Sequence, residues 1–183
     1  MSSEQPLSVA VFGAGAFGRN HLRVYRQLEE SGFGVRLAAV AETDPVAAEM
    51  LRQQGNLSVF SSPEACLEAC RAGKLHLDAV SICVPTSVHY SVATQALAQG
   101  LDVLLEKPIA VALAEADALV GQAAATRQIL QVGLLERFNP AVAVAEAALV
   151  NVGTGTVVPA LLTVSVIVWL AVPPELVAAA VTV

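Results

Sequence analysis

Charged side chains are scarce in this chain. Only 14% of its 183 residues are charged, and ten basic side chains face sixteen acidic ones, for a formal net charge of -6. Nucleic-acid binding depends on clustered Lys and Arg, and the sequence has no such cluster. A hydrophobic fraction of 55% also excludes an intrinsically disordered chain. The composition predicts a folded domain whose partners do not include nucleic acid.

Cysteine is equally sparse, and its spacing excludes the common metal and disulfide patterns. Cys66 and Cys70 lie four residues apart on a predicted helix, and Cys83 stands alone, with no CxxC pair. No further Cys or nearby His completes a ligand set, so we expect buried thiols and no metal site. The chain also lacks a GxSxG elbow, a Walker sequence and an HExxH pair. Serine hydrolase, P-loop and zincin chemistry are therefore not predicted.

A long apolar run is missing as well. The opening residues MSSEQPLSV have no basic segment followed by an apolar core, so no secretory signal is predicted and a cytoplasmic location is expected. The most apolar stretch, residues 157–172, is shorter than the roughly 20 residues that span a bilayer, and it contains Pro159. No membrane partner is predicted.

Glycine forms the strongest motif, at the end of a β-branched run that reads LSVAVFGAGAFG. Gly13, Gly15 and Gly18 give the spacing GxGxxG directly after an expected strand. The first glycine suits a tight turn, the second lets the backbone approach a pyrophosphate, and the third lets a helix pack close to the strand. Apolar residues from Phe17 to Leu28 recur at helical spacing, which predicts that this helix follows. Its positive dipole end would then face the anion.

The remainder alternates between expected strands and helices. This alternation predicts an α/β fold with a doubly wound parallel sheet, the Rossmann NAD(P)-binding type. Expected strands cover residues 7–12, 35–41, 57–60, 78–84, 101–105 and 129–134, and expected helices cover 17–30, 47–54, 62–72, 89–99 and 113–126, with Thr86 or Ser87 as the cap of the fourth helix and Gly100 ending it.

Glu42 follows the second expected strand, where a dinucleotide fold places the acid that binds the adenosine ribose. It lies 24 residues beyond Gly18, and the residue after it is Thr43 rather than Arg. A 2′-phosphate would therefore meet a carboxylate without a cation, so NAD is predicted and NADP is disfavoured. Alternatively, Glu42 or Asp44 only starts the next helix. Asp44 fills that capping role, which leaves Glu42 free for the ribose.

Further candidates follow the fourth and fifth strands, because open α/β sheets bind ligands beyond the carboxyl ends of their strands. Lys107 is the candidate catalytic residue: its ammonium can orient a hydroxyl and stabilise developing negative charge on oxygen. The alternative is a surface ion pair. His89 has two open interpretations, a cofactor contact or a helix N-terminus. The predicted cofactor-binding residues are Gly13, Gly15, Ala16, Phe17, Gly18, Glu42, Pro85, Thr86, His89, Glu106, Lys107 and Pro108, with the cis or trans state of the bond before Pro108 left open.

Three other polar residues are given smaller parts. His21, on the helix after the glycine turn, is interpreted as packed or half-exposed rather than catalytic. Arg137 either contacts substrate or cofactor or, as we prefer, pairs with Glu136. His76 lies in no motif and is given no role.

Two segments, DAVSICVPTSVHYSVATQALAQGLDVLLEKPIA and VGLLERFNPAV, together with the opening GAGAFGRNHLRVY, resemble the glucose-fructose oxidoreductase and inositol dehydrogenase family, Gfo/Idh/MocA. Within it, the chain is most similar to the branch of the UDP-N-acetylglucosamine 3-dehydrogenases. The resemblance covers Leu7 to about Leu149 and is most specific at the EKP triplet and the ERFNP segment. One position departs: Leu134 stands where relatives commonly carry His.

This resemblance implies an NAD-dependent oxidoreductase that acts on a CH–OH group of a small-molecule sugar or sugar nucleotide. It also implies that Lys107 takes part in substrate binding and catalysis and that Glu106 helps to shape the nicotinamide pocket. Two other functions stay open: a dinucleotide-binding module without turnover, and a structural oligomerisation unit.

Composition changes near Asn151, beyond which Glu175 is the only charged residue. We predict a dinucleotide-binding domain over residues 1–125, a sixth strand and connecting helix over 126–150, and an apolar remnant of a C-terminal substrate domain over 151–183. Three interpretations of that last segment stay open: a truncated substrate domain, an altered sequence, or a membrane-associating end. An uncovered apolar surface also predicts a homo-oligomer.

Overall fold

A computed structural model of the chain describes residues 5–138. The chain divides into two compact units, Met1–Gly133 and Leu134–Val183. The predicted connecting helix after residue 138 and the apolar segment 151–183 lie outside the described residues. The elements of the first unit are β1 Leu7–Phe12, α1 Ala16–Glu30, β2 Val35–Ala41, α2 Pro45–Gln53, β3 Ser58–Phe60, α3 Pro63–Arg71, β4 Ala79–Ile82, the 3-10 turn η1 Thr86–Val88, α4 His89–Ala98, β5 Asp102–Leu105, α5 Leu113–Thr126 and β6 Leu130–Val132.

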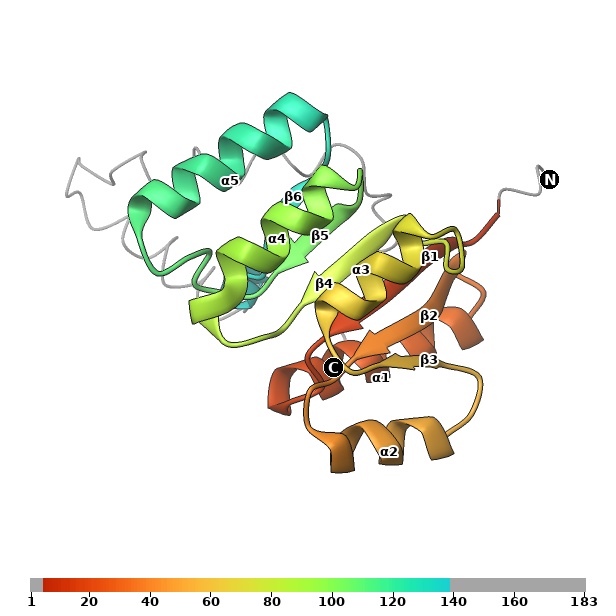
Figure 1. The fold of residues 1–183 in the computed structure, drawn as a ribbon. Coiled ribbons are helices and arrows are strands. Elements are labelled where there is room, and N and C mark those ends of the chain that lie inside the picture. Colours follow the sequence, from red (N-terminus) through yellow and green to blue (C-terminus); the bar gives the residue numbers. More distant parts are fainter. Residues whose placement is uncertain (1–4, 139–183) are drawn as a thin grey trace, which may run out of the picture. The chain divides into compact units, whose positions relative to one another are not determined.

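The six strands of this unit form one sheet in the order β3-β2-β1-β4-β5-β6, and every neighbouring pair is parallel. The chain therefore builds outward from β1 to β3, crosses back to place β4 beside β1, and builds outward again on the other side (Figure 1). This doubly wound order confirms the predicted Rossmann fold. It also leaves β1 and β4 as central neighbours, and the direction in which the sheet is built reverses between them.

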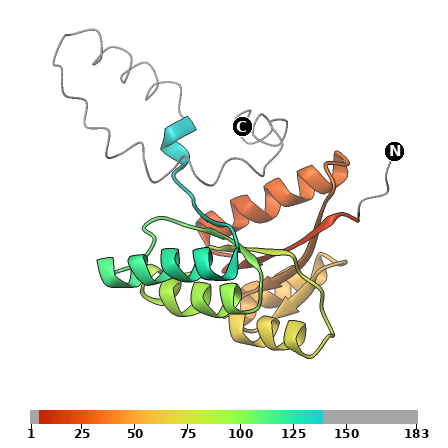
Figure 2. The ribbon, with the colours of Figure 1, turned by 90° about the horizontal axis from the view of Figure 1, so that it is seen from above.

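Helices cover both faces of the sheet and bury two hydrophobic clusters. Figure 2 shows α1 on one side of the sheet and α4 and α5 on the other. Alternate residues of β1 supply the two clusters: Val9 and Val11 pack with residues of α1 and α2, whereas Ala10 and Phe12 pack with residues of α3, α4 and α5. Burial on both faces explains why β1 is an almost continuous apolar run.

A β-bulge in β2 breaks this alternation. Val9 pairs with Leu37, but Ala10 pairs with Ala39, so Ala38 is an extra residue. Leu37 packs in the α1 and α2 cluster, and two positions later Ala39 packs in the opposite one. From Ala39 onwards, the bulge thus exchanges the two faces of the sheet towards which alternate β2 residues point, before the strand ends at Ala41.

Helix ends follow the sequence with one exception. Asp44 caps α2 by accepting hydrogen bonds from the backbone N–H groups of Val46 and Ala47, as predicted. Gly100 has φ +78° directly after α4, which confirms it as the C′ residue. The predicted cap at Thr86 or Ser87 is wrong, because neither side chain caps α4: both residues lie in η1, and the chain enters the helix from this turn.

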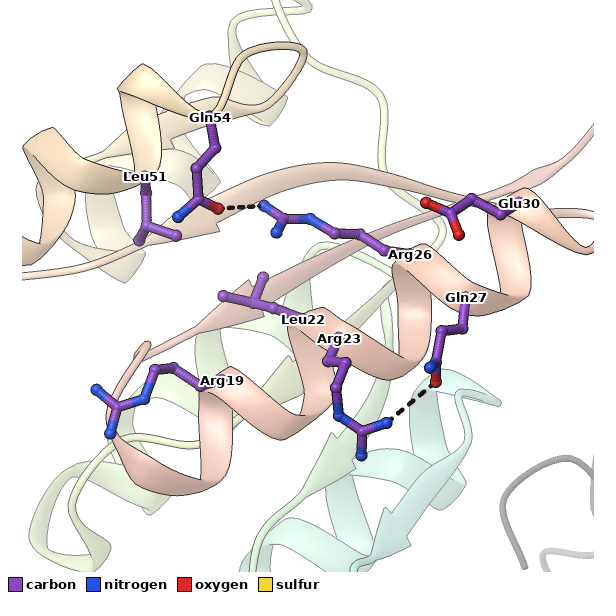
Figure 3. A pocket seen from close by; sticks show the side chains of 8 residues that line it. All are labelled: Arg19, Leu22, Arg23, Arg26, Gln27, Glu30, Leu51 and Gln54. Carbon is purple, nitrogen blue, oxygen red and sulfur yellow. Dashed lines mark hydrogen bonds between the residues drawn. The ribbon is translucent and has the colours of Figure 1, made fainter. Parts of the chain in front are cut away.

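A groove of about 390 Å³ runs between α1 and α2 on the outer surface of one helical layer (Figure 3). Arg26 of α1 donates a hydrogen bond to Gln54, just beyond α2, at 2.9 Å and so links the two helices. In the second unit, residues 134–138 are described and contain the 3-10 turn η2 Leu135–Phe138. Across the described residues, no helix is long and apolar enough to cross a membrane.

Candidate functional site

The glycine turn lies at the carboxyl end of β1 and is held against two neighbouring strands. The backbone N–H of Gly13 donates to Ala41 at 2.8 Å, and its φ of +87° is one that glycine adopts freely. A side chain on Gly13 would come within 2.8 Å of the Cys83 carbonyl oxygen. Gly18 is equally confined, since a Cβ there would collide with the Gly13 carbonyl. Both positions therefore require glycine for packing alone.

Gly15 differs from these two glycines. A Cβ added there would meet no atom within 4 Å, so nothing in the protein itself requires glycine at this point. Gly15, Ala16 and Phe17 are all exposed. Gly15 is the N-cap of α1, and no side chain caps the helix there. The first turn of α1 thus offers backbone N–H groups and the positive end of the helix dipole to solvent, which suits an anion.

Glu42 lies at the carboxyl end of β2 beside the glycine turn. Its Oε2 accepts a hydrogen bond from the Ala14 N–H at 2.6 Å, and its Oε1 accepts one from the Asp44 N–H at 2.8 Å. The sequence suggested that the Glu42 carboxylate would be free of other contacts. In the structure, two backbone N–H groups hold it in place. Each oxygen keeps a second lone pair, and the residue is half-exposed, so it can still accept hydrogen bonds from hydroxyl groups.

The end of β5 carries a buried carboxylate. Glu106 is 6% exposed, and its Oε1 lies 3.0 Å from Nε2 of His21 on α1. A Cβ on Gly133 would lie 3.1 Å from the same oxygen, so the absence of a side chain at 133 gives Glu106 its space. His21 thus connects the helix of the glycine turn to the EKP triplet.

Lys107, the residue after Glu106, also lies close to α1. Its side chain is exposed, and its Nζ lies 5.6 Å from the centroid of the Phe17 ring, a cation–π geometry. The following peptide bond, Lys107–Pro108, is cis. The predicted cofactor residue Phe17 and the predicted catalytic residue Lys107 therefore meet in space, although 90 positions separate them in the chain.

The loop after β4 holds the remaining candidates. Pro85 is exposed and Thr86 half-exposed, at the carboxyl edge beyond the end of β4. His89 begins α4 but is 1% exposed, with Nδ1 2.8 Å from the Pro108 carbonyl oxygen and Nε2 2.9 Å from that of Val84. The structure thus places His89 at a helix N-terminus, as one interpretation held, and in addition between two loops.

Cys83 directly follows β4, and its thiol is protonated at neutral pH. Burial, reinforced by the nearby Glu106 carboxylate, raises the pKa of the Cys83 thiol to about 12. A thiol in this state is a poor nucleophile at neutral pH. Within the described residues, no group of three or more His, Cys, Asp or Glu side chains could hold a metal ion.

The pairing of His21 with Glu106 is the main feature that sequence reasoning missed. A signal was present: His21 lies three positions after Gly18 and four before Tyr25, on the helix face that packs on the sheet.

His76 lies near Asp78 at the opposite end of β4, with 3.2 Å between Nε2 and Oδ1. Arg137 is exposed, and the predicted partner side chain of Glu136 is not among those described.

Comparison with known proteins agrees with this geometry. Residues 7–134 match the family model Gfo/Idh/MocA, described as an oxidoreductase family with an NAD-binding Rossmann fold. The chain is 32% identical over 136 residues to the UDP-N-acetylglucosamine 3-dehydrogenase of Acidithiobacillus ferrooxidans, covering 74% of this chain and 39% of that protein. It is 31% identical over 141 residues to the scyllo-inositol 2-dehydrogenase (NAD(+)) of Bacillus subtilis, covering 76% and 39%.

A solved structure gives the same result in three dimensions. The A. ferrooxidans UDP-N-acetylglucosamine 3-dehydrogenase superposes with a TM-score of 0.65 at 31% identity, covering 79% of this chain and 44% of that one. The chain spans about two fifths of the length of the curated relatives it matches. Motif, fold and comparison agree, and the chain belongs to the Gfo/Idh/MocA family of oxidoreductases with an NAD-binding Rossmann fold.

Proposed function

We propose that this chain is the cofactor-binding part of an NAD-dependent oxidoreductase that acts on a secondary alcohol of a sugar or sugar nucleotide. The observation that carries the proposal is the open position at Gly15. The protein's own packing explains Gly13 and Gly18, but a side chain at Gly15 would meet nothing. Close approach of a ligand to the backbone is the remaining reason for glycine there.

The first turn of α1 fits a pyrophosphate. Its N-terminus has no side-chain cap, its residues from Gly15 to Phe17 are exposed, and the helix dipole favours negative charge at this end. The relatives named for UDP-N-acetylglucosamine and for scyllo-inositol with NAD(+) support a dinucleotide here and a hydroxyl-bearing substrate.

Glu42 supports NAD over NADP. The hydrogen bonds from Ala14 and Asp44 hold its carboxylate in one place, where its spare lone pairs face solvent beside the glycine turn. Ribose hydroxyls can donate to such a carboxylate, whereas a 2′-phosphate would bring like charges together. Two unit charges about 4 Å apart repel by roughly 1 kcal/mol in water and 4 kcal/mol near a protein surface. We therefore expect NAD to bind at least about fivefold more tightly than NADP.

Lys107 is the proposed catalytic residue. A bound nicotinamide would supply the acceptor for the hydrogen that leaves the alcohol carbon. The exposed Lys107 ammonium can hydrogen-bond the reacting hydroxyl and stabilise the negative charge that grows on its oxygen. Glu106, buried and paired with His21, would form the wall behind Lys107 rather than a second acid or base.

Calorimetric titration of the chain with NAD and with NADP tests the nucleotide site. The Gly15→Ala variant should lower the melting temperature by no more than about 5 °C, because its new methyl group meets no protein atom and alanine is only a poorer N-cap than glycine, yet it should lose at least about tenfold in NAD affinity. The matched control is Gly121→Ala in α5, which also meets no atom and should bind NAD like the parent.

Two outcomes would overturn the nucleotide assignment. One is unchanged NAD affinity in Gly15→Ala, which would remove the proposed pyrophosphate contact. The other is tighter binding of NADP than of NAD to the parent chain, which would contradict the part given to Glu42. If NAD binds but no NADH forms with UDP-N-acetylglucosamine or a cyclic polyol, this chain is a dinucleotide-binding module without turnover.

A further inference from the structure

The ring of His89 lies where the loops that follow β4 and β5 meet. It is 1% exposed, and both of its nitrogens face backbone carbonyl oxygens: Nδ1 faces Pro108 at 2.8 Å, and Nε2 faces Val84 at 2.9 Å. Both distances are those of N–H···O hydrogen bonds and are shorter than the roughly 3.3–3.6 Å of weak C–H···O contacts. The ring therefore bridges two segments that belong to different strands.

Carbonyl oxygens only accept hydrogen bonds, so the two segments cannot bond to each other through these oxygens, and the His89 ring is the group that lies between them. At 1% exposure, solvent offers the ring no substitute partner. We infer that His89 is a positioning residue that holds the Lys107–Pro108 segment against the end of β4.

The bridge made by His89 affects the position of Lys107, because Lys107 directly precedes Pro108, whose carbonyl oxygen contacts the His89 ring. Releasing this carbonyl frees the segment that places the Lys107 ammonium over Phe17. Only the catalytic importance of that placement rests on the proposed function. The bridge itself does not depend on it.

Two amide variants separate the bridge from a general packing role. The side-chain nitrogen of Asn superposes on Nδ1 of histidine and that of Gln on Nε2, so His89→Asn keeps the donor to Pro108 and His89→Gln keeps the donor to Val84. Both variants are neutral and of similar size. Only the Gln variant should release Lys107.

The position of Lys107 can be read directly, because the chain has only two lysines, Lys74 and Lys107. Reductive methylation with ¹³C-labelled formaldehyde gives one NMR signal for each lysine and one for the N-terminal amine. The ring current of Phe17 should shift the Lys107 signal away from the Lys74 signal, and Phe17→Leu should abolish that shift. We expect His89→Gln to abolish it as well and His89→Asn to retain most of it.

An unchanged Lys107 signal in His89→Gln would overturn the inference. Equal loss of the shift in His89→Asn and His89→Gln would also overturn it, because it would show a packing role without a specific tie to Pro108. The measurement uses no nucleotide, so failure to bind NAD would leave its result standing.

Discussion

Replacing Gly18 with Ala tests how the glycine turn is packed. The new methyl group would lie 2.8 Å from the carbonyl carbon of Gly13 and closer still to its oxygen, whereas ordinary contacts begin at 3.4 Å. The obstructing atoms belong to the backbone of Gly13, and Gly13 is itself confined by the backbone of Cys83. No flexible side chain can therefore move to make room for the methyl group. The carbonyl carbon alone would have to move by 0.6 Å, the difference between those two distances, and the closer oxygen requires a larger movement.

The expected loss of stability follows from two opposing effects. Overpacking a tight site costs about 1–3 kcal/mol, with more where backbone has to move. Replacing a helical glycine with alanine gains about 1 kcal/mol from helix propensity. Because the obstruction is backbone, we expect a net loss of about 2 kcal/mol, which corresponds to a melting temperature roughly 8 °C lower for a unit of this size.

Gly121→Ala is the matched control, because Gly121 is also helical and a Cβ there meets nothing within 4 Å. The same chemical change should raise the melting temperature by about 2–4 °C. Differential scanning calorimetry of the two variants and the parent measures both signs. Equal melting temperatures for Gly18→Ala and Gly121→Ala would refute the argument, because they would show that the turn relaxes at no cost.

Four further predictions concern capping, a buried hydrogen bond, alkaline stability and turnover. Asp44→Ala should lose about 1 kcal/mol in urea unfolding, because two N–H groups of α2 lose their acceptor; an unchanged midpoint would contradict this. The hydroxyl of Tyr25 lies 2.7 Å from that of Ser81, so Tyr25→Phe should cost about 1–3 kcal/mol, and adding Ser81→Ala should recover much of it; strictly additive losses would exclude the pair. Burial raises the pKa of Cys66 from 9.0 to about 12, so unfolding releases its proton and stability falls as pH rises from 9 towards 12, by at most about 1.4 kcal/mol per pH unit; Cys66→Ala should show a shallower fall over the same range. Lys107→Ala should leave NAD affinity within about twofold in calorimetry and abolish any NADH formation, and a variant that still turns over would exclude the catalytic part given to Lys107.

The features that sequence could predict depend on local chemistry. The glycine spacing predicted the turn and the start of α1, because a tight strand-to-helix turn needs glycine at the positions of Gly13 and Gly18. The pair Asp44-Pro45 predicted the start of α2, since a capping carboxylate and a first-turn proline both act within one turn. Apolar strand segments separated by helical patterns were sufficient to predict the order of elements and the parallel sheet.

The features that escaped depend on distant partners. The extra residue Ala38 in β2 becomes visible only through the pairing of β2 with β1, because a bulge is defined by two strands. The His21 and Glu106 pair joins positions 85 residues apart, and the bridge made by His89 joins two loops. Thr86 and Ser87 have the right chemistry for a cap, but the 3-10 turn places them ahead of the helix. The sequence found the candidate positions without the connections between them.

The two backbone hydrogen bonds to Glu42 have a practical consequence for altering nucleotide preference. The same carboxylate that would repel a 2′-phosphate also fastens the tip of β2 to Ala14 inside the glycine turn. Protein engineers who exchange this acid for a neutral or basic residue would remove a mechanical tie along with a charge. Any exchange of this acid would therefore need a compensating acceptor for the Ala14 N–H, such as a hydroxyl side chain reaching it from the neighbouring loop.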